Sequence, residues 1–222
     1  MIDELIEKIV SGPYFLKLKS VVENGPYHDH ERTFDHLIKT KDIAQRELEA
    51  GFITNPQAKE KFLEFVKEDF NGYKRADLMV LAALLHDVGK LLSVKEEGKL
   101  RSIVVNTPEG DTIIPGHEYW GSTIIFKFLE NLSLPKEIVN YISEIVGMHG
   151  EFQGEYLPSK KEWSMDKLIN DIKSRAKGFY IESLFNHYCD VYTAAPFQEM
   201  KPTVLGIFNQ PSLYLKREYI IE

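Results

Sequence analysis

The stretch ALLHDVGK, residues 83–90, closes a segment that is apolar on almost every side, ADLMVLAALL at residues 76–85. A helix of this composition is expected to be buried from all directions. It nevertheless runs into the adjacent His86 and Asp87, with Lys90 three residues further on. Burying a carboxylate and an imidazole costs free energy unless each finds a partner. Either these two side chains satisfy one another in a core network, or a cation lies between them.

The rest of the chain predicts a mostly helical protein. Apolar residues at helical spacing, separated by glycine and proline, predict helices over residues 2–10, 15–23, 33–51, 56–70, 76–92, 116–132, 135–149, 164–176 and 178–194. Residues 101–115 contain two β-rich runs around a turn and predict a small β-hairpin insertion. We therefore expect one all-α domain over residues 1–222, a helical bundle with a core of about residues 33–194. The tail, about residues 197–222, receives no assignment.

Composition excludes several classes of function. A length of 222 residues suits one domain. The net charge of −7 argues against binding to long nucleic acid, although a metal could still attract a small phosphorylated ligand. No stretch reaches the roughly 18 apolar residues of a membrane span, and the first residues lack the features of a secretory signal. The single cysteine, Cys189, cannot form an intramolecular disulfide, so we expect a cytoplasmic protein.

Histidine and aspartate recur at the apolar ends of the predicted helices. Besides the pair already named, these residues are His36, His117, His149 and Asp190. Imidazole nitrogen and carboxylate oxygen are ligands that suit zinc, iron and manganese, among other metals. The recurrence of such groups where helices are expected to pack together indicates a metal site.

The order His36, His86-Asp87, Asp190 resembles the H…HD…D pattern of the HD-domain metal-dependent phosphohydrolase superfamily. The segment LAALLHDVGK is similar to the central motif of that family. IPGHEYWGS, with His117, resembles one of the additional histidine motifs of subfamilies that hold two metal ions, and IVGMHG, with His149, resembles the other. The resemblance extends from about residue 33 to about residue 194. Two departures are the long gap before His86 and the predicted hairpin.

This resemblance implies an HD-domain helical bundle with one or two divalent ions, of which Mn, Fe, Mg and Zn are candidates. One ion would be held by His36, His86, Asp87 and Asp190. A second would be held by His117 and His149, with Asp87 bridging the two. Asp87 is then a catalytic residue that helps to position a metal-bound hydroxide. Lys90 lies one helical turn beyond His86 and is assigned to the phosphate of the substrate.

The predicted function is that of a metal-dependent phosphohydrolase, acting on a nucleotide or another phosphomonoester or phosphodiester. The motifs around His117 and His149 are similar to the HD domains attached to bacterial tRNA nucleotidyltransferases. One alternative is a di-iron oxygenase of the same fold, which would use the same six residues. A second alternative is a nucleotide-binding module without turnover. The expected partner is a small phosphorylated substrate, with neither membrane nor long nucleic acid, and a homodimer is left open.

Several of these residues also have a purely structural interpretation. His117 could cap its helix or contact substrate directly, and Lys90 could favour the negative end of a helix. His28 and His30, in PYHDHERTFD, are expected to belong to a solvated turn. The hairpin leads directly into His117, so it is either a lid or an inert insertion.

Overall fold

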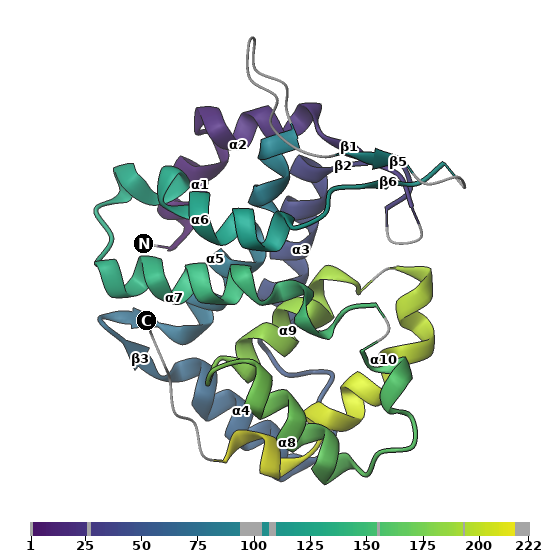
Figure 1. Cartoon of the computed structure of the whole chain (residues 1–222). Helices are drawn as coiled ribbons and strands as arrows, with labels where there is room; N and C mark the ends of the chain where they lie inside the picture. Colours follow the sequence, from purple (N-terminus) through teal and green to yellow (C-terminus); the bar gives the residue numbers. More distant parts are fainter. Residues whose placement is uncertain are drawn as a thin grey trace.

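The computed structural model of the chain describes residues 2–25, 28–93, 104–106, 110–154, 156–192 and 194–215. Helices dominate these residues, as the sequence predicts, and the strands are short (Figure 1). The all-α fold class is therefore confirmed. None of the described helices combines the length and the apolar character that crossing a bilayer requires.

The α-helices, in chain order, are α1 (Ile2–Val10), α2 (Pro13–Lys17), α3 (Thr33–Glu47), α4 (Pro56–Lys67), α5 (Arg75–Leu85), α6 (His117–Leu129), α7 (Lys136–Gly147), α8 (Met165–Arg175), α9 (Tyr180–Asp190) and α10 (Ala195–Phe208). Short 3-10 helices are η1 (Leu18–Ser20), η2 (Val88–Ser93), η3 (Glu130–Leu132), η4 (His149–Phe152), η5 (Pro158–Lys160) and η6 (Pro211–Tyr214). The strands form antiparallel pairs: β1 (Val22–Glu23) with β2 (Glu31–Arg32), β3 (Asp69–Phe70) with β4 (Tyr73–Lys74), and β5 (Val105–Asn106) with β6 (Thr112–Ile113).

Local chemistry explains where two of the helices begin. At the start of α4, the side chain of Asn55 accepts hydrogen bonds from the backbone N–H groups of Gln57 and Ala58. Pro56 occupies the first helical position, where its missing N–H costs nothing. At the start of α8, the Ser164 hydroxyl accepts from the backbone N–H of Lys167. Both helices begin where the sequence predicts, because capping is a local property.

Three predicted helices are wrong in part. The helix expected over residues 56–70 ends at Lys67, and Asp69–Phe70 form β3, paired with β4. The helix expected over residues 15–23 ends in η1, and Val22–Glu23 instead form β1, paired with β2. The helix expected over residues 76–92 ends at Leu85 and is followed by the separate turn η2. The periodicity of the apolar residues does not reveal these breaks, because each depends on pairing or packing with another segment.

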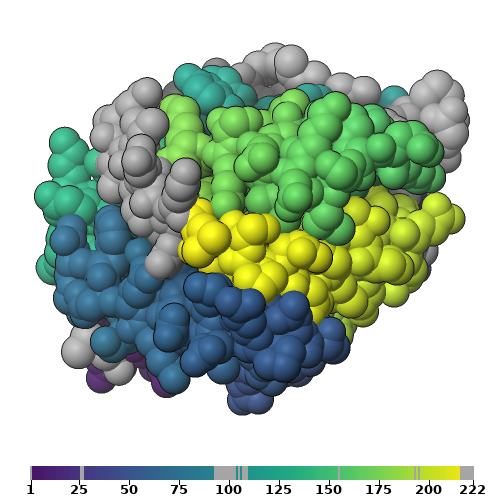
Figure 2. Space-filling view, turned by 90° about the horizontal axis from the view of Figure 1, so that it is seen from below, coloured from purple at the N-terminus to yellow at the C-terminus, as the bar shows by residue number. Residues whose placement is uncertain are grey.

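The described part of the C-terminal tail, residues 197–215, is largely helical, and it packs against the body of the protein. Seen from below, the yellow C-terminal segment lies between blue and green parts of the chain (Figure 2). The helix η6 contacts α4 on one side and α8 on the other. The Lys173 ammonium on α8 donates to the carbonyl of Leu215, at 2.9 Å. Of the predicted hairpin, the β5–β6 pair is confirmed, whereas residues 101–103 and 107–109 lie outside the described residues.

The helix α5 is buried between two groups of apolar side chains. Leu78, Leu81 and Leu85 pack with α1, α2, α6 and α7, toward one end of the molecule (Figure 1). Met79 and Ala83 pack with α4, α8, α9 and α10, toward the other. This position explains why α5 has apolar residues on every side, and it places both polar ends of the helix inside the protein.

The polar start of α5 is neutralised by a buried network. The Arg75 guanidinium, 3% exposed, donates to Glu182 on α9 at 2.8 Å and to Glu68 at 3.1 Å. The hydroxyl of Tyr141 on α7 donates to the same Glu182 oxygen at 2.8 Å. A buried charge is tolerated only with such partners. The network therefore ties α5, α7 and α9 together at the end of α5 opposite to Asp87.

We predict that Gly89→Ala destabilises the protein. A Cβ atom at Gly89 would overlap the carbonyl oxygen of His117 and lie 2.5 Å from the backbone nitrogen of Gly121, both on α6. Backbone atoms cannot move aside cheaply, so we expect a loss of about 3 kcal/mol in the free energy of unfolding, near the top of the range for overpacking. Urea denaturation measures this loss. The matched control is Gly51→Ala, since a Cβ there meets nothing within 4 Å. Equal stability of the two variants would contradict the prediction.

Candidate metal centre

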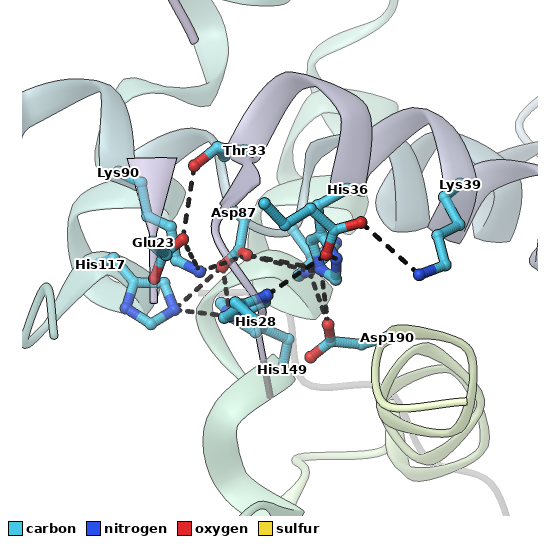
Figure 3. Close-up of polar contacts among 12 residues, drawn as sticks. Glu23, His28, Thr33, His36, Lys39, Asp87, Lys90, His117, His149 and Asp190 are labelled. Carbon is cyan, nitrogen blue, oxygen red and sulfur yellow. Dashed lines mark hydrogen bonds and ion pairs between the residues drawn. The ribbon is translucent and has the colours of Figure 1, made fainter. Parts of the chain in front are cut away.

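The six predicted ligands converge at the C-terminal end of α5. Figure 3 shows His36, His117, His149 and Asp190 around Asp87. The six ligands come from five parts of the chain: α3, the α5–η2 junction, α6, η4 and α9. They form two groups, in each of which the ligand atoms lie within 4.8 Å of one another. The first group, here called the Asp190 group, is His36, His86 and Asp190, and the second, here called the His117 group, is Asp87, His117 and His149.

The Asp190 group is compact. Oδ1 of Asp190 lies 2.8 Å from Nε2 of His36 and 3.2 Å from Nε2 of His86. The two Nε2 atoms are 3.3 Å apart. The Nε2 atom of His86 also lies 3.3 Å from Oδ2 of Asp87, which reaches toward this group from the α5–η2 junction.

The His117 group uses the other oxygen of Asp87. Oδ1 of Asp87 lies 3.0 Å from Nε2 of His117 and 3.4 Å from Nε2 of His149. These two Nε2 atoms are 3.2 Å apart. One carboxylate therefore faces both groups, with one oxygen toward each, and Asp87 occupies the centre of the arrangement (Figure 3).

The outer nitrogens of the four imidazole rings all contact acceptors. Nδ1 of His86 donates to the carbonyl of Ala83 at 2.9 Å, and Nδ1 of His149 donates to the carbonyl of Val146 at 2.6 Å. Nδ1 of His117 likewise donates to the carbonyl of Ile114 at 2.8 Å. A carbonyl only accepts hydrogen bonds, so each of these Nδ1 atoms carries the proton.

Nδ1 of His36 is also a donor, but its acceptor is a side chain and not a backbone carbonyl. This atom donates to Oε2 of Glu31, on β2, at 3.2 Å. Hydrogen bonds from His28 and His36 hold the pKa of Glu31 well below its usual range. Outer partners of this kind orient a ring and fix its tautomer, as they do at many metal sites.

With the proton on Nδ1, each neutral ring presents the lone pair of Nε2 to the centre. The Nε2 pairs at 3.3 and 3.2 Å then have no proton to share, and two lone pairs repel one another. Either an additional proton or a cation must lie between them. Four imidazole nitrogens and two carboxylates form a donor set that suits divalent metals such as zinc, iron and manganese. The residues present therefore fit the metal that the sequence predicts.

The electrostatics also favour positive charge at this place. Burial alone would raise the pKa of Asp87, but the charges of Lys90 and of the neighbouring imidazoles hold it well below its usual range. Burial alone would likewise raise the pKa of Asp190, but the neighbouring His86 and His36 hold it well below its usual range. Burial alone would lower the pKa of His86, yet the charges of Asp87 and Asp190 raise it to about 10. Positive charge is therefore favoured at His86, whereas burial lowers the pKa of His149.

Lys90 lies inside the site, 3% exposed. Its Nζ atom is 2.6 Å from Oδ2 of Asp87 and 2.6 Å from Oε1 of Glu23. The ammonium also lines a cavity that opens onto the centre. In that cavity it contacts these two carboxylates. Burial alone would lower the pKa of Lys90, and Asp87 and Glu23 together raise it above its usual range. Glu23 was not anticipated from the sequence, because it falls in a segment predicted to be helical.

Two further residues at the site were not predicted. His28, expected in a solvated turn, is partly buried, and its ring packs edge-on against His36 with the centroids 4.7 Å apart. The amide of Gln153 donates to Oδ2 of Asp190 at 2.6 Å. Neither position carries a sequence signal, since one follows a turn and the other lies in a polar stretch. His30 is exposed, as expected.

A cavity of about 370 Å³ opens onto the centre. Besides Asp87, Lys90, His117 and Asp190, its walls include Glu23, Asn24, His28, Asp111, Ile113 and Val191. The carbonyl of Asn24 accepts a hydrogen bond from the backbone N–H of Thr112 at 2.7 Å. This bond joins the β1–β2 hairpin to the β5–β6 hairpin, so both hairpins form one wall of the cavity.

The fold and the donor groups together define a class: helical proteins with buried histidines and aspartates that could hold a divalent metal ion. Residues 33–173, more than half of the chain, match the family model described as HD domain. The chain therefore belongs to the HD domain family, whose members are usually metal-dependent phosphohydrolases. The match ends before Asp190. Comparisons with curated proteins and with solved structures find no match.

We predict that substitutions in the two groups remove metal to different extents. Asp87→Ala should abolish binding to both groups, because this carboxylate faces each of them. His149→Ala should remove the ion of the His117 group and spare that of the Asp190 group. Metal analysis of the purified variants measures the outcome, with His30→Ala as an exposed histidine control. Full metal content in Asp87→Ala would contradict this arrangement.

We also predict that metal stabilises the fold in a pH-dependent manner. Removal of the metal with EDTA should lower the melting temperature by several degrees, since a ligand at 100 times its Kd adds about 2.7 kcal/mol. Protons compete for the same nitrogens, and the pKa of His86 is raised without metal. The difference should therefore be smaller at pH 6 than at pH 8. Thermal melts with and without EDTA at the two pH values measure it, and a melting temperature that EDTA changes at neither pH would refute a buried metal centre.

Proposed function

We propose that the protein is a metal-dependent phosphohydrolase that acts on a nucleotide or another phosphomonoester or phosphodiester. The observation that carries the proposal is the position of Asp87. Its two oxygens face two separate donor groups, 3.3 Å from His86 and 3.0 Å from His117, and the residue lines the cavity. Membership in the HD domain family supports the same chemistry.

Divalent ions held by these groups would activate a water at neutral pH and polarise a phosphoryl oxygen. The protein itself supplies orientation. Asp87 is fixed between two sets of imidazoles and by the ammonium of Lys90, so its oxygens cannot rotate freely. Gln153 holds the second oxygen of Asp190 in the same way. Such fixed groups favour catalysis because little reorganisation is needed in the transition state.

The cavity walls complete the proposed active site. The two hairpins cover one side of the centre and limit the access of bulk water, which strengthens electrostatic interactions within it. The β5–β6 hairpin thus acts as part of a lid. Since β1 near the N-terminus and α9 near the C-terminus both contribute to the cavity, we propose that residues 1–222 act as one domain.

The test is hydrolysis of a small panel of phosphate esters. The panel contains nucleoside mono-, di- and triphosphates, cyclic nucleotides and a generic diester, each with Mn²⁺, Fe²⁺, Mg²⁺ or EDTA. We expect turnover that requires metal and falls at least a hundredfold in His86→Ala, whose ring lies in the Asp190 group. His30→Ala is again the control. No turnover by protein that carries bound iron, together with consumption of oxygen, would refute the proposal in favour of an oxygenase.

A further inference from the structure

The cavity at the metal centre has an unusual balance of charge for a phosphate site. Among its described lining residues, four carry carboxylates, namely Glu23, Asp87, Asp111 and Asp190. The one ammonium among them is that of Lys90. These five groups sum to a charge of −3, and two divalent ions would bring the total to +1. A monoester phosphate carries nearly two negative charges at neutral pH, whereas a diester carries one.

Lys90 does not add free positive charge to this balance, because it is shared by two carboxylates. Its Nζ atom lies 2.6 Å from Asp87 and 2.6 Å from Glu23, and all three side chains are at least nine-tenths buried. An ammonium in contact with two carboxylates is already overcompensated. It can donate a hydrogen bond to a ligand, but it cannot balance a second negative charge on that ligand.

Glu23 is held in this position by the fold around it. Glu23 pairs with Glu31 in the β1–β2 hairpin. The hydroxyl of Thr33 lies 3.4 Å from Oε1 of Glu23. Glu23 also precedes the segment that matches the HD domain, which begins at residue 33. The carboxylate that neutralises Lys90 is therefore contributed by the N-terminal extension and not by the matched part of the chain.

We propose that Glu23 is a specificity-determining residue, which makes the site favour a phosphoryl group with one negative charge, as in a phosphodiester, over a group with two. This inference rests on the proposed function. The walls suit the same ligand: Ile113 and Val191 offer apolar surface to the organic groups of a diester, and Asn24 offers polar groups beside them. A terminal phosphate would instead place its second charge near Glu23 and Asp111.

The test compares two probe anions by calorimetry on Mn²⁺-loaded protein at pH 8. Inorganic phosphate is the doubly charged probe, and dimethyl phosphate is the singly charged one. In Glu23→Gln we expect phosphate to bind on the order of tenfold more tightly, since one nearby charge is removed. Dimethyl phosphate should bind about threefold more tightly, because it carries half the charge and the change in Coulomb free energy is halved. The matched control is Asp29→Asn, an exposed carboxylate of the same hairpin, which should change neither affinity.

A second variant and a kinetic ratio distinguish a specific role of Glu23 from misfolding of the Glu23→Gln variant. Asp111→Asn removes a lining charge from the other hairpin and should shift phosphate binding in the same direction. For hydrolysis, the ratio of kcat/KM for bis(p-nitrophenyl) phosphate to that for p-nitrophenyl phosphate should fall about threefold in Glu23→Gln, because the gain is about tenfold for the monoester and about threefold for the diester. Unchanged phosphate affinity in both variants would overturn the role of Glu23. If no variant hydrolyses any ester, the proposed function fails, and the binding data alone decide the role of Glu23.

Discussion

Burial of α5 from Leu78 to Leu85 is the constraint on which the rest of the structure depends. A helix enclosed by apolar side chains on every face cannot direct its polar ends to solvent, so each end must be neutralised within the protein. At the start, Arg75 is balanced by Glu182 and Glu68. At the other end, a larger set of histidines and aspartates surrounds Asp87. The first network is balanced by protein groups alone, whereas the second has nitrogen lone pairs facing each other, and either an additional proton or a cation must lie between them.

The packing of α6 against the α5–η2 junction makes this second network possible. His117 is the first residue of α6, and its carbonyl lies directly against Gly89. Only a residue without a side chain allows the two backbones to approach so closely. Gly89 therefore acts on the centre indirectly. The close backbone approach that it permits allows the His117 ring to reach the carboxylate of Asp87.

The sequence predicts which residues come together at the candidate centre better than it predicts their surroundings. His36, His86 and Asp87 each follow or interrupt an apolar pattern, and that interruption is a signal in the chain itself. Glu23 lies in β1, within a segment predicted to be helical. His28 and Gln153 lie in irregular segments, where polar residues are ordinary. None of the three carries such a signal. Their position at the centre results from the pairing of β1 with β2 and from the packing of η4 against α9. The helices were predictable from periodicity, whereas the end of α5 and the β1–β2 hairpin depend on contacts between distant residues.

The outer hydrogen bonds of the imidazole rings determine at which stage the orientation of each ring becomes fixed. In His86, His117 and His149, Nδ1 binds the carbonyl of the residue three positions earlier, so each ring is oriented by its own stretch of backbone. Side-chain freedom is then lost as the helices form and not as an ion arrives. His36 differs, since its partner Glu31 belongs to a separate hairpin. Local backbone thus fixes the orientation of three rings. The orientation of the fourth, His36, depends on formation of the β1–β2 hairpin.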